Sequence, residues 1–323
     1  MRTVKQLTLT YSIVLGCVLT GLVQAQDQAV SRSDPSPNPL GVATLRWYQA
    51  NHSGAHIPAS TSPAAIAFDG SSMWISHGAD GTVSKLRASD GELLATYPLG
   101  GSTGALLYDG ANIWVTNGGT SVQKLRASDG SVVGSFSLTT YGPMVFDGTN
   151  IWVVLTGVPP TSVAKVRAID GTVLQTIPLN QPIESMAFDG SNIWVGLGNG
   201  TAVKLRISDG ATVATYGSLG LVLGMAFDGA NMWVADNTGS VHKLRVSDGA
   251  VLGTFTFTDF FPVGLVFDGS SMWVTSQVGH AVKKLRGTDG TTLATVTFSA
   301  NPGLLAFDGV NIWVLVGSNF FKL

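Results

Sequence analysis

The stretch Phe227-Asp228-Gly229-Ala230-Asn231-Met232-Trp233-Val234 decides the fold, because near-copies of it recur along the chain. Each copy reads aromatic, Asp, Gly, a small or apolar residue, Asn or Ser, Ile or Met, Trp, and then Val or Ile. The other copies are Phe68–Ile75, Tyr108–Val115, Phe146–Val153, Phe188–Val195, Phe267–Val274 and Phe307–Val314. Successive Asp residues are 40, 38, 42, 39, 40 and 40 positions apart. A constant period of this length indicates a repeat architecture.

Each repeat contains four short runs rich in Val, Ile, Leu, Trp, Phe and Thr, which are residues that favour strands. In the second repeat these runs are Gly104–Tyr108, Asn112–Thr116, Ser121–Arg126 and Ser131–Phe136. Asp-Gly pairs follow the first and third runs, and Asp-Gly is a strong hairpin signal. No segment carries a sustained helical period. The sequence therefore predicts an all-β, seven-bladed β-propeller with four antiparallel strands per blade.

The two ends of the repeat region complement one another. The last repeat stops at Phe320-Phe321-Lys322-Leu323 and lacks a fourth strand. Before the first repeat, Ala55-His56-Ile57-Pro58 resembles Ala95-Thr96-Tyr97-Pro98, and Ile57 and Tyr97 each precede a repeat Asp by 12 positions. We therefore expect an N-terminal strand, near residues 53–59, to complete the C-terminal blade and close a propeller that spans residues 41–323. Closure of this kind removes the exposed edge of an open ring.

The segment before the repeats has two parts. Residues 1–25 resemble a secretory signal peptide, with Arg2 and Lys5 ahead of an apolar run and small residues near Ala25. A short membrane anchor or a lipoprotein processed at Cys17 are the alternatives. Residues 26–40 are rich in Ser, Pro, Asp and Gln and are predicted to be a flexible spacer. These features predict a secreted or periplasmic protein with no membrane span after cleavage and, in its mature form, no cysteine.

Composition narrows the classes of partner. Of the 323 residues, 45% are hydrophobic and 12% are charged, which suits a large core and not a disordered chain. The net charge of −2 gives no basic field, so nucleic acid is not an expected partner. We expect a monomer.

Residues that recur in every repeat are interpreted as structural. The set comprises one Trp per repeat, the turn Asp residues, and a third-strand Lys-Leu-Arg pattern that recurs in almost every repeat and is varied as Lys165-Val166-Arg167. A sugar-stacking Trp set and a polyanion-binding belt are the functional alternatives. However, a residue present in all the repeats cannot mark one site. We expect the Trp side chains at contacts between blades, and the Lys and Arg heads in water or beside Asp.

The connections after the second and fourth strands vary and would lie together on one face, which favours that face for binding. The candidate ligand-binding residues there are His77, Asn117, Tyr141, Glu184, Asp236 and Asp259. Each also has an ordinary interpretation as a solvated loop residue. The ligand would be an unknown protein or a small molecule.

No catalytic residue, metal site or cofactor is predicted. His52 and His56 lack the spacing of a zinc site, and no Gly-x-Ser-x-Gly motif or usable Cys is present.

The repeats resemble the YVTN/NHL group of bacterial propellers, with Trp114-Val115-Thr116-Asn117 closest to the signature that names the first. The resemblance covers about residues 53–323 and implies the propeller fold. The streptogramin lyases are similar propellers, and that resemblance implies clustered His and Glu with magnesium, for which this chain has no matching cluster. Quinoprotein dehydrogenase subunits are similar at the level of the blade, without matching cofactor residues.

Three hypotheses for function remain. The leading one is a non-catalytic binding or scaffold protein. The alternative is a lyase or hydrolase of the streptogramin-lyase type, with a site at the mouth of the central channel. A cell-surface adhesion protein is the third. Fold alone does not separate them, because function depends on the site.

Overall fold

The computed structural model describes residues 57–58, 62–140, 142–157 and 160–323, all within the compact unit Tyr48–Leu323. The predicted signal peptide and spacer, and most of the predicted closing strand, lie outside these residues. The described residues form strands and connections only. Within them, no helix with the length and apolarity needed to cross a membrane is found.

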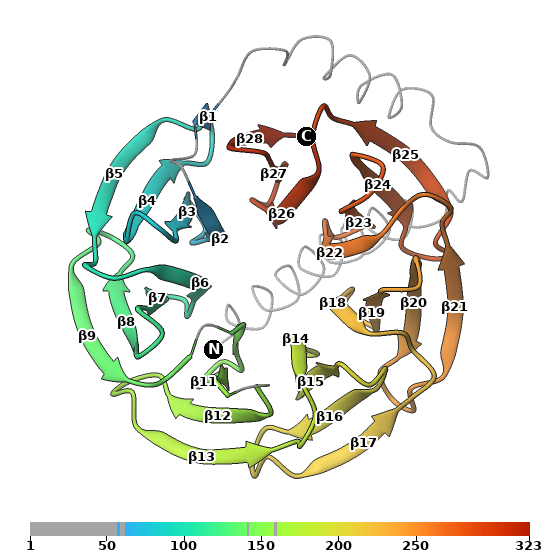
Figure 1. Cartoon of the computed structure of the whole chain (residues 1–323), viewed down its shortest axis with the longest axis horizontal. Helices are drawn as coiled ribbons and strands as arrows, with labels where there is room; N and C mark the ends of the chain where they lie inside the picture. The colour runs from blue at the N-terminus through green and yellow to red at the C-terminus, as the bar shows by residue number, and fades with distance from the viewer. Residues whose placement is uncertain (1–56, 59–61, 141, 158–159) are drawn as a thin grey trace, which may run out of the picture. The chain divides into compact units, whose positions relative to one another are not determined.

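The strands form seven four-stranded antiparallel sheets arranged around a common axis, with the first strand of each sheet innermost (Figure 1). Blades 1 to 3 comprise β2 (Pro63–Phe68), β3 (Ser72–His77), β4 (Thr82–Arg87) and β5 (Leu93–Pro98); β6 (Thr103–Tyr108), β7 (Asn112–Asn117), β8 (Ser121–Arg126) and β9 (Val132–Ser137); and β10 (Met144–Phe146), β11 (Asn150–Leu155), β12 (Ser162–Arg167) and β13 (Val173–Pro178). Blades 4 to 6 comprise β14 (Ile183–Phe188), β15 (Asn192–Leu197), β16 (Ala202–Arg206) and β17 (Thr212–Tyr216); β18 (Val222–Phe227), β19 (Asn231–Asp236), β20 (Ser240–Arg245) and β21 (Val251–Thr256); and β22 (Pro262–Phe267), β23 (Ser271–Ser276), β24 (Ala281–Arg286) and β25 (Thr292–Thr297). Blade 7 comprises β26 (Pro302–Phe307), β27 (Ile312–Val316), β28 (Asn319–Lys322) and β1 (Ile57–Pro58).

The predicted fold class is confirmed. In the second repeat the observed strands differ from the predicted runs by one residue at a few of their ends. The last blade takes its outer strand from the other end of the described chain, since β1 pairs with β28 through Ile57↔Phe320 and Pro58↔Asn319. Blade 7 also contacts blade 1 directly, because Lys322 Nζ donates to the carbonyl oxygens of Ala88 and Ser89 at 2.7 and 2.8 Å.

The recurrent Trp packs each blade against the next, as predicted. Trp233 of blade 5 is fully buried and lies in one apolar cluster with Met272 and Leu285 of blade 6. Its ring stacks on Phe255 of its own outer strand, with centroids 5.5 Å apart. Large aromatic surfaces removed from water at every such contact stabilise the ring.

The recurrent Asp holds the turn before this Trp. Asp228 Oδ1 accepts hydrogen bonds from the backbone amides of Ala230 and Asn231, and Oδ2 accepts one from Trp233 Nε1 at 2.7 Å. Gly229 has a φ of 93°, which glycine tolerates without steric cost. The Asp-Gly-x-Asn/Ser-x-Trp pattern is therefore one hydrogen-bonded unit and not a paired-acid site.

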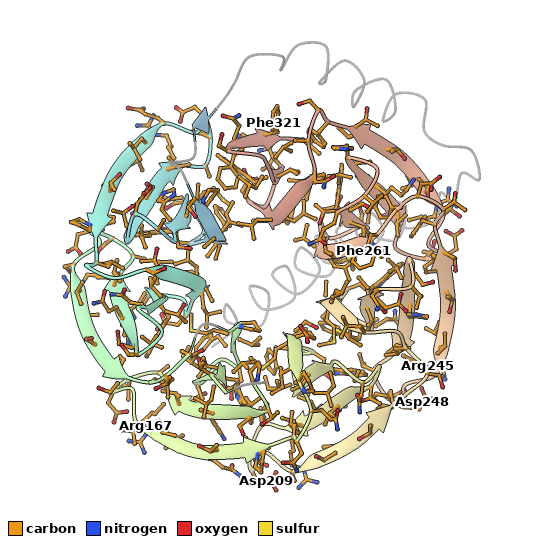
Figure 2. All side chains as sticks on the ribbon, viewed as in Figure 1. Arg167, Asp209, Arg245, Asp248, Phe261 and Phe321 are labelled. Atoms are coloured by element: carbon orange, nitrogen blue, oxygen red, sulfur yellow. The ribbon has the colours of Figure 1, made fainter. Side chains whose placement is uncertain are left out.

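The third-strand cations differ in where their heads lie. Lys243 Nζ lies 5.1 Å from the Trp233 ring and 3.7 Å from Asp228, and it donates to the Gly287 carbonyl of the next blade. The lysine head therefore lies beside Asp, one of the two expected settings, and its charge is used inside the contact between blades and not in water. The arginines are exposed except for the half-buried Arg286, and they pair with turn carboxylates, as Arg245 does with Asp248 at 2.9 Å on the outer edge in Figure 2.

The register of each blade divides its connections between two faces. In blade 1, Pro63, His77, Thr82 and Pro98 align at one edge of the sheet. We call the face formed by the connections after second and fourth strands the variable face. The face formed by the Asp-Gly turns after first and third strands is the turn face.

Candidate functional site

The structure changes the setting of three predicted site residues. His77, Asn117 and Asp236 end the second strands of blades 1, 2 and 5, with only 1%, 6% and 1% of their surfaces exposed. They are not ordinary solvated loop residues. Glu184 and Asp259 are exposed on the variable face, and Tyr141 lies outside the described residues.

These three residues occupy one repeat position, three after the Trp. In chain order this position holds His77, Asn117, Leu155, Leu197, Asp236, Ser276 and Val316. The position before the third-strand lysine holds Ser84, Gln123, Ala164, Val203, His242, Lys283 and Phe321. We call the two positions of one blade its variable pair. The pair is polar in blades 1, 2, 5 and 6 and apolar in blades 3, 4 and 7. The scaffold therefore does not require one type of residue at these two positions.

In blade 5 the variable pair is a buried hydrogen-bonded Asp–His pair. Asp236 Oδ2 lies 2.8 Å from His242 Nε2, and His242 Nδ1 lies 3.1 Å from Thr254 Oγ1. Asp236 also accepts from the Gly220, Thr238 and Ser240 amides. Burial alone would raise the pKa of Asp236, but the hydrogen bonds from Thr238, His242 and Gly220 lower it below the usual value. The carboxylate is therefore ionised and fixed in place.

In blade 1 the variable pair joins His77 Nε2 to Ser84 Oγ at 2.9 Å. Burial lowers the pKa of His77, against the opposing charge of Asp80, so the imidazole is neutral at pH 7. His77 Nδ1 is buried without a hydrogen-bond partner among the described residues.

In blade 2, Asn117 Nδ2 donates to the Leu99 carbonyl at 3.0 Å, while Asn117 Oδ1 and Gln123 Oε1 are buried without described partners. Gly101 is required beside this amide, because a Cβ there would lie 2.3 Å from Asn117 Oδ1.

In blade 6 the variable pair is Ser276 and Lys283. Ser276 Oγ accepts from the Phe261 amide at 2.7 Å and from the Val278 amide at 3.1 Å. Lys283 Nζ lies 5.5 Å from the centre of the Phe257 ring and 5.1 Å from that of Phe260.

The connection between blades 5 and 6 brings these groups into one region. The Phe257 amide donates to the Gly239 carbonyl at 3.0 Å, which ties the connection to blade 5. On the other side, the Gln277 amide donates to the Phe261 carbonyl at 3.0 Å, which ties it to blade 6. We call this region the 5–6 sector, which comprises Asp236, His242, Phe257, Asp259, Phe260, Ser276, His280 and Lys283.

Backbone strain marks the same face. Among the described residues, the non-glycine positions with positive φ are Asn180, Ser218, Asp259 and His280, with φ of 57°, 65°, 56° and 50°. All four lie in connections of the variable face, and two belong to the 5–6 sector. Left-handed conformations are uncommon for residues with a Cβ and concentrate at functional sites, although Asn, Asp and His adopt them more readily than other residues.

Sequence reasoning missed His242, Lys283 and Phe257. The Lys-Leu-Arg repeat marks the third strand as structural, and the residue before the lysine is not part of that pattern. The signal is in the aligned repeats, where this position holds Ser, Gln, Ala, Val, His, Lys and Phe and so varies in polarity and charge.

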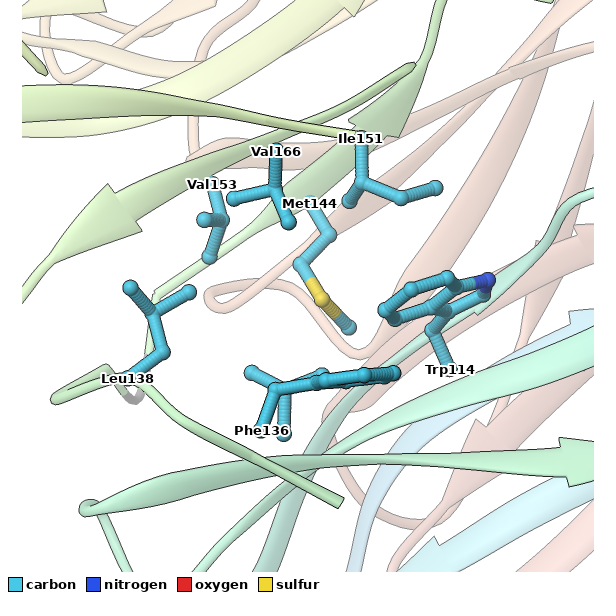
Figure 3. Close-up of a pocket in the computed structure, with 8 residues that line it drawn as sticks. Trp114, Phe136, Leu138, Met144, Ile151, Val153 and Val166 are labelled. Atoms are coloured by element: carbon cyan, nitrogen blue, oxygen red, sulfur yellow. The ribbon is translucent and has the colours of Figure 1, made fainter. Parts of the chain in front are cut away.

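Two other features do not form a site. An apolar cavity between blades 2 and 3 has a volume of about 10 Å³ and is lined by Trp114, Phe136, Leu138, Met144, Ile151, Val153 and neighbours (Figure 3). It is too small and too apolar to hold an ordered water or a ligand. Over the described part of the chain, no group of three or more His, Cys, Asp or Glu residues is placed to hold a metal ion.

Comparison with known proteins supports the fold. No family model matches the chain, and no curated protein matches it. Two similar solved structures are a virginiamycin B lyase from Staphylococcus aureus and a streptogramin B lyase. The first is 16% identical with a TM-score of 0.67, covering 81% of this chain and 95% of that one. The second is 17% identical with a TM-score of 0.69, covering 83% and 95%. The chain is thus a seven-bladed propeller with structural neighbours of the streptogramin B lyase type.

Proposed function

We propose that this protein is a binding protein that takes its ligand on the variable face, in the 5–6 sector. One observation carries the proposal: the polar variable pairs of the adjacent blades 5 and 6 lie in this sector together with two of the four described non-glycine residues that have positive φ. In six blades the same Asp, Trp and Lys residues make the contact with the next blade, whichever residues occupy the variable pair. The residues of the variable pair can therefore be selected for binding.

The hydrogen bonding of the Asp–His pair favours binding over catalysis. Both oxygens of Asp236 accept hydrogen bonds, and both nitrogens of His242 have partners. A general base needs a nitrogen directed at the substrate proton. In this arrangement His242 must first exchange Thr254 for a substrate, so the pair as it stands fixes the shape of the sector.

The test is a screen of small molecules and short peptides by ligand-observed NMR, followed by amide hydrogen exchange with each hit. We expect protection in peptides that cover residues 257–261 and 276–283, and none in the turn-face peptides around Asp209 and Asp248. Hits that protect only the turn face, or a screen without hits, would contradict the proposal.

A second candidate, a lyase, is favoured by the names of the two structural neighbours. Incubation with virginiamycin B and mass spectrometry of the products tests it directly. Turnover that is lost in Asp236→Asn and kept in the turn-face control Asp209→Asn would establish the lyase and displace the leading proposal.

A further inference from the structure

Lys283 differs from every other third-strand lysine of the propeller. The repeat lysine at the following position lies over the Trp ring in each blade. In six blades it also donates to a backbone carbonyl of the next blade. Lys283 makes neither contact. Among the described residues it has no carboxylate within ion-pair distance and no hydrogen-bond acceptor for its side chain.

The surroundings of Lys283 are aromatic. Its Nζ lies over both Phe257 and Phe260, whose rings are 5.2 Å apart and tilted by 60°. The side chain is half-buried, and this burial lowers the pKa of Lys283. The Nζ atom of Lys283 is not fully buried, so it keeps contact with water. An ammonium with three donors therefore meets only ring faces and solvent.

We propose that Lys283, Phe257 and Phe260 form a subsite for a ligand carboxylate that is attached to an aromatic or other apolar group. The carboxylate would replace water on Nζ and supply the acceptor that the protein lacks. A charge-assisted hydrogen bond in a partly desolvated setting is stronger than a neutral one. The apolar part of the ligand would lie against the partly buried Phe257 ring, because Phe260 is only 5% exposed and belongs to the core between blades 5 and 6. This inference rests on the proposed function, because the subsite belongs to the 5–6 sector.

The neighbouring strands add no competing charge. Lys283 is paired with Val274 on β23 and with Thr295 on β25, which are both neutral. The ion pairs of β24 are those of Lys284 with Asp268 and of Arg286 with Asp289, and among the described residues Lys283 forms none with Asp259 of the nearby connection. The lysine thus presents its charge to a ligand and not to the protein.

The test compares phenylacetate with its neutral isostere phenylacetamide by titration calorimetry and two-dimensional NMR. We expect the wild-type protein to bind phenylacetate at least about 10-fold more tightly, the size expected for one charge-assisted hydrogen bond. Lys283→Met should remove the difference between the two ligands, and Lys283→Arg should retain part of it. Arg206→Gln, which removes the same charge from the turn face, should leave both affinities unchanged.

Equal affinities for the two ligands in the wild-type protein, or equal phenylacetate affinity in wild type and Lys283→Met, would overturn the subsite. So would the absence of phenylacetate binding at 10 mM. If other ligands from the screen still protect the 5–6 sector, only this inference fails. If no ligand does, the proposed function fails as well. Circular dichroism and the melting temperature of Lys283→Met show whether the variant is folded.

Discussion

At the scale of the residue, an Asp and a Trp make the same contact in each blade, and in six blades a Lys joins them to the next blade, which leaves other positions free to differ. Asp228 orders its turn, fixes the indole nitrogen of Trp233 and lies beside Lys243. Each polar group of this unit has a hydrogen-bond or ion-pair partner within it, so its burial does not destabilise the fold. His77, Asn117 and Asp236 belong to a second class, whose identity the scaffold does not dictate.

Asp228→Ala should destabilise the protein by about 2–4 kcal/mol, because it leaves the Trp233 indole and two backbone amides without an acceptor. Urea unfolding measures the change. Asp248→Ala is the control, because this exposed carboxylate pairs with Arg245 on the surface, and it should leave the unfolding midpoint close to that of wild type. Equal losses in the two variants would contradict the structural role of Asp228.

The turn aspartates also predict a response to acid. Burial raises the pKa of Asp228, but hydrogen bonds from Trp233, Ala230 and Asn231 outweigh it, so the folded-state pKa is below 3.8. A group with a depressed folded pKa stabilises the fold above its unfolded pKa and loses that contribution as the pH falls through the folded value. We therefore expect the melting temperature to be steady from pH 7 to 5 and to fall steeply below pH 4. Asp228→Asn should flatten part of that fall, and an unchanged pH profile would contradict this account.

At the scale of the element, the third strand connects one blade to the next. Lys243 on β20 reaches the Gly287 carbonyl of blade 6, and its side chain is only 9% exposed. Lys284 on β24 lies beside Asp268 at 3.1 Å and is 24% exposed, but among the described residues it donates to no carbonyl oxygen of blade 7. Lys243 and Lys284 occupy the same repeat position and differ in whether they bond a carbonyl oxygen of the next blade.

Lys243→Met should cost about 2–4 kcal/mol, because it leaves a buried carboxylate and a carbonyl with fewer partners. Lys284→Met should cost about half as much. Chemical denaturation of both variants gives the comparison, with Lys283→Met expected near wild type because Lys283 bonds no protein acceptor. A larger loss for Lys284→Met than for Lys243→Met would refute the role given to the carbonyl contact.

Strand positions were predictable because periodic apolar residues and Asp-Gly turns report local structure. The burial of the site residues was not predictable from the same local signals. His77, Asn117 and Asp236 follow a strand and precede Gly, Asn or other turn residues, which favours a loop in any local interpretation. Their burial results from the neighbouring blade's connection, such as Leu99–Thr103 against Asn117. Likewise, the meeting of Lys283 with Phe257 depends on contact between two blades, which repeat spacing does not specify.

At the scale of the whole molecule, closure of the ring depends on its two ends. β1 adds two residue pairs to β28, and Lys322 joins blade 7 to blade 1. A closed ring leaves no first or last blade with an exposed edge, and it lets loops vary without loss of the scaffold.

Removal of residues 1–60, which deletes β1, should lower the melting temperature by several degrees and promote association through the uncovered β28 edge. Removal of residues 1–40, the predicted signal peptide and spacer, should leave the melting temperature unchanged. Calorimetry and light scattering of the two proteins make the comparison. Equal melting temperatures would show that β1 does not support the ring.

The most direct test of the central claim, that ligands bind where the blades differ, is a crystallographic fragment screen that maps every bound fragment on the ring. We predict that fragments concentrate in the 5–6 sector, with carboxylates beside Lys283. Fragments spread evenly over the seven blades, or gathered on the Asp-Gly turns, would contradict it.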